Sequence, residues 1–278
     1  MKCAWNQLLS ILPQHMRSEV DRLGKDSLQE LRLRIGVPVL MITGRDCLSL
    51  KFQTTLEDIH FVINTASRYS PWSTATAASG YITAPGGHRI GLCGQCVYQE
   101  GKVTGIREIT SLCIRVARDF PGLATGIVLD ASVLILGPPG SGKTTLLRDM
   151  IRRAGECGTS SVAVVDERGE LFPGNAGFFR GEHTDVLTGC DKKSGIDMVL
   201  RTMGPTHIAV DEITAEEDCR ALLRAGWCGV HLLATAHAAS LEDLQARPVY
   251  RPLVQARLFE RIVILKQDKS WKVERMKL

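Results

Sequence analysis

Alternating hydrophobic and polar positions mark the first part of the chain. In Leu28–Ile35 the apolar residues Leu31, Leu33 and Ile35 alternate with arginines, which predicts a strand buried on one face. Apolar residues at helical spacing in Leu56–Ser67 predict a helix. Further short strands, the first two as a hairpin, are expected at Pro38–Thr43, Cys47–Phe52, Tyr81–Thr83, Arg89–Cys93 and Ile114–Val116. These elements together predict an α+β domain.

The pattern changes after Pro121–Gly122, a turn signal. Short apolar runs typical of buried parallel strands follow at Ser132–Leu136, Val162–Val165, Ile208–Val210 and His231–Ala234. Helix-length segments lie between them at Lys143–Ala154, Gly195–Met203 and Ala215–Trp227. This alternation predicts a parallel α/β sheet, and a terminal hairpin is expected at Phe259–Lys266 and Ser270–Arg275. We therefore expect two domains, at residues 1–122 and 123–278.

A glycine-rich loop follows the first of these apolar runs. Its sequence GPPGSGKT, residues 137–144, fits the phosphate-binding P-loop. Glycines let backbone N–H groups surround phosphate oxygens, and the following helix start adds a positive dipole end. Lys143 is expected to reach the β- and γ-phosphates and Thr144 to bind Mg²⁺. The residues expected to hold ATP are Gly137, Pro138, Pro139, Gly140, Ser141, Gly142, Lys143, Thr144 and Thr145. The strand–loop–helix context favours this interpretation over a plain glycine turn.

Two acids end the apolar run that begins at Ile208. Asp211 is expected to hold Mg²⁺. Glu212 is expected to orient and deprotonate the attacking water. A solvated strand end is the alternative, but phosphoryl transfer needs both of these roles filled. The P-loop therefore favours the functional interpretation.

Two further strand ends carry candidate residues. The first is Asp166–Arg168, which follows the run Val162–Val165. In the sequence this run lies between the strand before the P-loop and the strand before the two acids, so we expect an additional strand in the sheet. The run beginning at His231 leads to Thr235 and His237. Ligands of open α/β sheets bind at the carboxyl ends of strands, so Glu167, like these two residues, should face the phosphates. His237 is expected to sense the γ-phosphate through a hydrogen bond, with a purely structural histidine as the alternative.

Composition indicates the partners, the location and the cysteine chemistry to expect for the protein. The 278 residues carry a net charge of +4, too weak to indicate nucleic acid or an anionic membrane as partner. We expect a cytosolic protein, because no signal-peptide layout or run of about 20 apolar residues is present. Nine cysteines then predict free thiols. Cys93 and Cys96 form a single CxxC, which we interpret as packing in a Gly-rich turn rather than a metal or redox site.

The order of these motifs resembles that of the type II/type IV secretion ATPase superfamily. The shared set is the P-loop, the acidic box Asp166–Arg168, Asp211–Glu212 and the box Gly229–Ala238. A longer match, covering nearly the whole chain, resembles the stage III sporulation AA family. It includes Glu30–Gly36, Gly86–Gly94, Ile114–Arg118, Gly142–Asp149, Val165–Arg168, Thr184–Leu187 and Phe259–Arg261.

This resemblance implies an N-terminal domain before a RecA-like ATPase domain. It implies a hexameric ring at the cytosolic face of a membrane complex, with membrane proteins of the mother cell–forespore channel as partners. From the weak net charge, we expect no nucleic acid as a partner. It also implies that N-terminal arginines complete an ATP site between the domains. Arg89 and Arg115 match these arginines best, and Arg107 and Arg118 match less well. One departure is Thr214, which stands where the motility ATPases carry arginine.

Two competing hypotheses assign the protein to other functional classes. A nucleic-acid-binding ATPase would show a strong basic patch with interleaved aromatic residues. The sequence does not show one, and we interpret the Lys266–Lys277 cluster as a solvated face. A catalytically inactive scaffold is disfavoured because the P-loop lysine and both acids of the strand end are intact.

Overall fold

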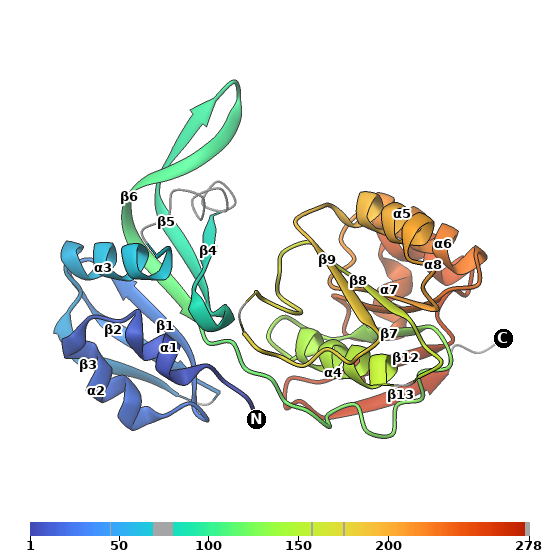
Figure 1. Ribbon diagram of the computed structural model, residues 1–278, viewed down its shortest axis with the longest axis horizontal. Helices are drawn as coiled ribbons and strands as arrows, with labels where there is room; N and C mark the ends of the chain where they lie inside the picture. Colours follow the sequence, from blue (N-terminus) through green and yellow to red (C-terminus); the bar gives the residue numbers. More distant parts are fainter. Residues whose placement is uncertain (45, 69–79, 157, 175, 276–278) are drawn as a thin grey trace. The chain divides into compact units, whose positions relative to one another are not determined.

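The chain forms two compact units in the computed structural model (Figure 1). The structure describes residues 1–278 except 45, 69–79, 157, 175 and 276–278. One unit comprises Met1–Asp119 with Pro173–Phe178, and the other comprises Phe120–Phe172 with Phe179–Leu278. The segment Pro173–Phe178 therefore belongs with the N-terminal unit, although the sequence analysis placed it in the second domain.

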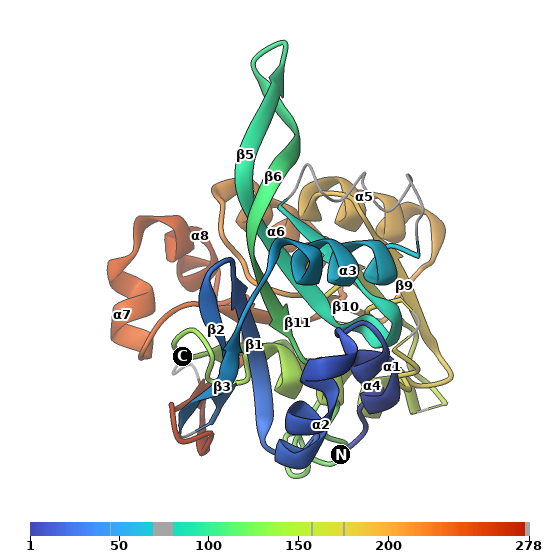
Figure 2. The same cartoon turned by 90° about the vertical axis from the view of Figure 1, so that its left-hand side faces the viewer.

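The N-terminal unit is built on a six-stranded antiparallel sheet of order β3-β2-β1-β6-β5-β4. Its strands are β1 Leu28–Arg34, β2 Val37–Thr43, β3 Cys47–Gln53, β4 Tyr81–Thr83, β5 Arg89–Gln99 and β6 Lys102–Arg115. Its helices are α1 Trp5–Ser10, α2 Gln14–Leu23, α3 Leu56–Ala66 and the 3-10 turn η2 Pro85–Gly87. The three α-helices share one hydrophobic core with the same sheet face (Figure 2).

Local sequence explains most of this unit. Leu31 and Leu33 of β1 are buried as their alternation predicts. Helix α3 starts with a capping box, in which Thr55 and Asp58 satisfy each other's backbone N–H groups. Ile35 was expected on the buried face, but it is 40% exposed. β1 ends at Arg34, and Ile35 keeps a backbone hydrogen bond to Thr110 and an isolated bridge to Thr54, so it lies at the edge of the regular ladder.

The β5–β6 hairpin is longer than the sequence predicted. Its distal part projects past the neighbouring strands (Figure 1, Figure 2). Cys93 and Cys96 lie in β5, are exposed, and flank a register shift between Cys93 and Gln95. Their predicted packing in a Gly-rich turn is therefore wrong. Within the described residues no cluster of His, Cys, Asp or Glu side chains could hold a metal ion by itself.

The C-terminal unit contains a seven-stranded sheet of order β13-β12-β7-β11-β10-β8-β9. Its strands are β7 Val133–Leu136, β8 Val162–Asp166, β9 Thr184–Thr188, β10 His207–Val210, β11 His231–Ala236, β12 Arg261–Leu265 and β13 Trp271–Arg275. All neighbours pair in parallel except β12 and β13, which form the expected terminal hairpin. The predicted parallel α/β sheet is thus confirmed.

Helices cover both faces of this sheet (Figure 1). They are α4 Lys143–Glu156, α5 Lys192–Thr202, α6 Glu216–Trp227, α7 Leu241–Ala246 and α8 Arg251–Gln255, with the 3-10 turn η3 Pro248–Tyr250. A hydrophobic core lies on each face of the sheet, and alternate residues of β7 pack into the two cores. Leu134 and Leu136 face α5 and α6, whereas Val133 and Ile135 face α4. None of the helices in the described residues is long and apolar enough to cross a membrane.

The order of the strands differs from the expectation in one respect. The additional strand between β7 and β10 is β11, which carries Thr235, and β8 pairs with the far edge of β10. Position in the sequence suggested β8 as the additional strand. The observed order brings the residues after β11 between the glycine loop and the two acids.

Candidate nucleotide-binding site

The glycine loop joins β7 to α4 with a backbone that demands glycine. Gly140 and Gly142 have φ values of 74° and 102°, in the left-handed region that other residues rarely adopt. A Cβ atom at Gly137 would lie 2.7 Å from the carbonyl oxygen of Leu265 and 2.7 Å from Ser141 Oγ. The loop therefore keeps its backbone N–H groups available at the start of α4, where anions bind.

Lys143 lies at the centre of the site and is only 7% exposed. Its Nζ donates to the carbonyl oxygens of Gly137 and Pro138 at 2.9 and 3.0 Å, and lies 3.0 Å from His237 Nδ1. Burial lowers the pKa of the lysine, and the negative charges of Asp211 and Glu212 oppose that shift. The ammonium is thus held where phosphate oxygens would approach the loop.

The two residues expected to hold Mg²⁺ lie side by side. Thr144 Oγ1 donates to Asp211 Oδ2 at 2.7 Å, and the buried Thr235 donates to Asp211 Oδ1 at 2.6 Å. A hydroxyl and a carboxylate are the hard oxygen ligands that Mg²⁺ prefers, and the ion usually keeps water and phosphate oxygens as its other ligands. These residues therefore fit a Mg²⁺ ion shared with phosphates.

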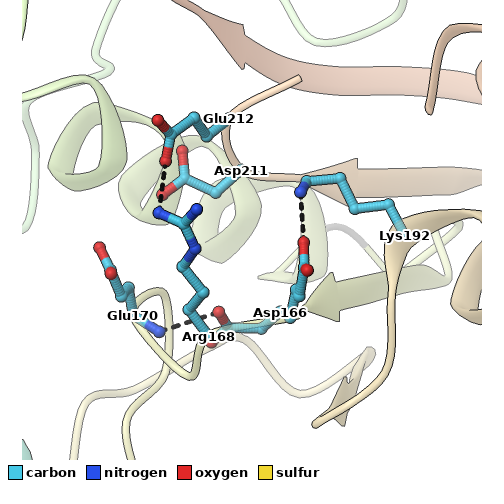
Figure 3. A pocket seen from close by; sticks show the side chains of 7 residues that line it. Asp166, Arg168, Glu170, Lys192, Asp211 and Glu212 are labelled. Carbon is cyan, nitrogen blue, oxygen red and sulfur yellow. Dashed lines mark hydrogen bonds and ion pairs between the residues drawn. The ribbon is translucent and has the colours of Figure 1, made fainter. Parts of the chain in front are cut away.

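Glu212 is fixed from three directions. Its backbone N–H donates to Thr235 Oγ1 at 2.8 Å, although its φ of 55° is unusual for a non-glycine residue. One carboxylate oxygen lies 3.1 Å from His237 Nε2, and the other accepts from Arg168 Nη1 at 3.0 Å (Figure 3). His237 thus lies between the lysine of the loop and the second acid, contacting both with its two ring nitrogens.

A small acidic pocket adjoins the two acids, at the carboxyl ends of β8 and β10 (Figure 3). Its lining residues are Asp166, Glu167, Arg168, Glu170, Lys192, Asp211 and Glu212. Glu167 accepts from Lys192, whose side chain at the start of α5 is 5% exposed. Sequence reasoning included Glu167 but missed Lys192, because only the tertiary fold brings the start of α5 to this strand end.

Asp166 organises the loop that follows β8. Its carboxylate accepts from the backbone N–H groups of Glu170, Leu171 and Phe172. Burial raises its pKa to about 6, a shift that the hydrogen bonds from Phe172 and Leu171 oppose. Asp166 therefore shapes the wall of the acidic pocket by fixing the loop after β8.

The arginines implied by the family resemblance lie in the N-terminal unit. Arg89 of β5 and Arg115 of β6 face each other in register. Arg89 stacks on the Tyr81 ring at 3.8 Å from its centroid, and Arg115 Nε lies 3.7 Å from a carboxylate oxygen of Glu30. The weaker candidates bond elsewhere in this unit: Arg107 to the side chain of Gln95, and Arg118 to the carbonyl oxygen of Asp26.

A P-loop after one strand of a parallel sheet, with an acid after a nearby strand aimed at its threonine, defines a P-loop protein of the RecA-like fold. Residues 4–275 match the family described as Sporulation stage III, protein AA, and the chain belongs to that family. The resemblance derived from the motifs is therefore confirmed.

Similar proteins agree with this assignment. Stage III sporulation protein AA of Bacillus subtilis (strain 168) is 35% identical in an alignment of 286 positions, which covers 95% of this chain and 92% of that protein. The Legionella pneumophila ATPase DotB has a similar structure, with a TM-score of 0.58 and 18% identity over 94% of this chain and 78% of that one. The pilus retraction motor PilT with bound ADP gives 0.61 and 18%, over 90% and 76% of the two chains. These two structures establish the shared fold.

Proposed function

We propose that this protein is a Mg-ATP hydrolase of the secretion-ATPase type. The observation that carries the proposal is the convergence of Asp211, Glu212 and His237 on Lys143 and Thr144 of the P-loop. Asp211 bonds Thr144 at 2.7 Å, and His237 lies 3.0 Å from Lys143 and 3.1 Å from Glu212. Phosphoryl transfer needs a cation on the phosphates, an acid on the metal and a group that orients water, and this set contains all three.

Each side chain has a distinct role in this proposal. Lys143 exchanges the loop carbonyl groups for β- and γ-phosphate oxygens. Thr144 and Asp211 hold Mg²⁺, which would neutralise charge on the phosphates. Glu212 accepts the proton of the attacking water. His237 keeps the carboxylate of Glu212 near the γ-phosphate. It also couples Glu212 to Lys143, because its two ring nitrogens contact these two side chains.

We further propose that hydrolysis energises a membrane-associated channel complex of sporulation. The similarity to Stage III sporulation protein AA over nearly the whole chain supports this role. By the same resemblance, the chain would act as a hexameric ring at the cytosolic face of the membrane. Arg89 and Arg115 would then supply positive charge to the γ-phosphate during hydrolysis.

Steady-state phosphate release by the full-length protein tests the proposal. Glu212→Gln keeps the shape of the side chain but cannot accept a proton, so we expect ATP to bind while hydrolysis slows by about 10²–10⁴-fold. Lys143→Ala should abolish turnover. Glu57→Gln is the matched control, because this exposed residue in the first turn of α3 undergoes the same chemical change.

The proposed function fails if the Glu212 or Lys143 variant releases phosphate at the parental rate. Release that depends on added single-stranded DNA would instead favour a nucleic-acid-binding ATPase.

A further inference from the structure

An apolar cavity opens beside the P-loop, apart from the acidic pocket. It has a volume of about 160 Å³. Its apolar wall comes from the segment before β7 and from the terminal hairpin, and its polar edge comes from the P-loop and the start of α4. The side chains that matter here are Phe120, Leu123, Leu265, Trp271, Ser141 and Thr145. A cavity of about 150 Å³ with apolar walls is large enough to take up a benzene ring.

The strand order sets the cavity and the acids on opposite sides of the P-loop. β7 lies between β11 and β12 in the sheet, and β10 follows on the β11 side. The two acids follow β10, whereas Leu265 ends β12 and Trp271 begins β13. A nucleoside triphosphate whose γ-phosphate faces the acids therefore has its other end directed toward the hairpin.

A buried hydroxyl lies where the P-loop meets the cavity. Ser141 is 1% exposed, and its Oγ makes no hydrogen bond within the described part of the chain. A buried hydroxyl without a partner costs about 1–3 kcal/mol, and a hydrogen bond to a bound ligand would remove that cost. Because Ser141 lines the cavity and belongs to the P-loop, the ligand should carry oxygen atoms at this point, as a sugar–phosphate does.

We propose that this cavity binds the adenine base of the nucleotide, with Trp271 of the terminal hairpin as its stacking surface. The inference rests on the proposed function and extends it from the phosphates to the base. Lys269 also lines the cavity and supplies N–H donors, which suit the ring nitrogens of adenine. None of the lining residues, all of which the structure describes, is acidic. Guanine therefore finds no carboxylate to accept from its two donor groups.

The affinities of the full-length protein for two probes separate the contribution of the base to binding from that of the phosphates. Mg-ATP carries both, whereas Mg-tripolyphosphate carries phosphates alone. Base–aromatic stacking is worth about 1–3 kcal/mol, so Trp271→Ala should weaken ATP binding by about 5- to 150-fold and leave tripolyphosphate binding unchanged. Trp271→Phe should retain most of the ATP affinity. Trp227→Ala is the matched control, because Trp227 ends α6, is 75% exposed and does not line the cavity.

A second variant distinguishes loss of the binding cavity from misfolding of the terminal hairpin. Leu123→Ser alters the cavity from the segment before β7, is 43% exposed in the parent, and should show the same selective loss of ATP binding. Unchanged ATP affinity in both variants would overturn the base site while leaving an ATPase intact. Equal loss of both probes, or tighter binding of GTP than of ATP, would also overturn it. If the parent protein binds neither probe, the proposed function itself fails.

Discussion

Replacing Thr235 with valine tests how the two acids of the site are held. The Thr235 side chain is fully buried, and its hydroxyl donates to Asp211 and accepts the backbone N–H of Glu212. Valine has nearly the same shape but offers neither hydrogen bond. The substitution therefore removes the link between the metal-binding acid and the proposed base without opening a cavity.

The expected magnitude follows from the lost contacts. A hydrogen bond to a charged group contributes about 1.5–3 kcal/mol, and a buried N–H left unpaired costs about 1–3 kcal/mol. The left-handed backbone of Glu212 adds a strain of about 1–2 kcal/mol that the bond to Thr235 helps to offset. Since the two losses overlap, we expect the free energy of unfolding to fall by about 2–4 kcal/mol. Displacement of the Glu212 carboxylate by about 1 Å would lower kcat by about 10²-fold.

Urea unfolding and steady-state phosphate release measure the two effects separately. Thr235→Ser is the control: it keeps the hydroxyl, loses one methyl group, and should cost about 1 kcal/mol of stability with little change in kcat. KM for ATP should stay close to the parental value, because Lys143 and the loop are untouched. A parental kcat in the valine variant, or equal loss in the serine variant, would refute the reasoning.

Three further outcomes are expected. Asp149→Ala should lower the free energy of unfolding in urea by about 3–5 kcal/mol, because the buried Arg152 loses its ion pair. For Asp166, the folded-state pKa of about 6 lies above the usual value of about 3.9, so the folded state binds more protons between these pH values. Its contribution to stability should therefore fall by up to about 3 kcal/mol as pH rises from 4 to 6, and Asp166→Asn should remove that part of the slope. Arg89→Ala and Arg115→Ala should each lower turnover by up to about 10³-fold with ATP binding retained, as measured by phosphate release and titration; parental turnover in both would exclude them from catalysis.

The P-loop was predictable because its determinants lie within a short stretch of sequence. A buried strand, a loop needing positive φ at glycine and a helix start follow one another between Val133 and Glu156. The acids after β10 were predictable for a similar reason, since the apolar run Ile208–Val210 at the end of this buried strand must stop where charged residues begin. These inferences need no knowledge of which strands pair.

The order of the strands could not be read in the same way. β7, β8, β10 and β11 are all short and apolar, so each satisfies the requirements of a central parallel strand equally well. Only the folded sheet shows that β11 separates the other two motif strands. Thr235 was expected to face the phosphates, but its role as a link to both acids depends on this pairing. Arg168 and Lys192 were missed as partners of Glu212 and Glu167 for the same reason, since their contacts join distant segments.

Glu212 shows most clearly why the geometry of the site escapes local rules. Nothing about a glutamate after an apolar strand predicts a positive φ, since side chains with a Cβ atom avoid that region. The conformation persists because Thr235 holds the backbone while Arg168 and His237 hold the carboxylate. Strained residues cluster at functional sites, where surrounding contacts over-determine them. Glu212, for which we propose the proton-accepting role, is therefore a residue at which the local rule fails. Its three partners come from two separate segments of the chain, one after β8 and one at the end of β11.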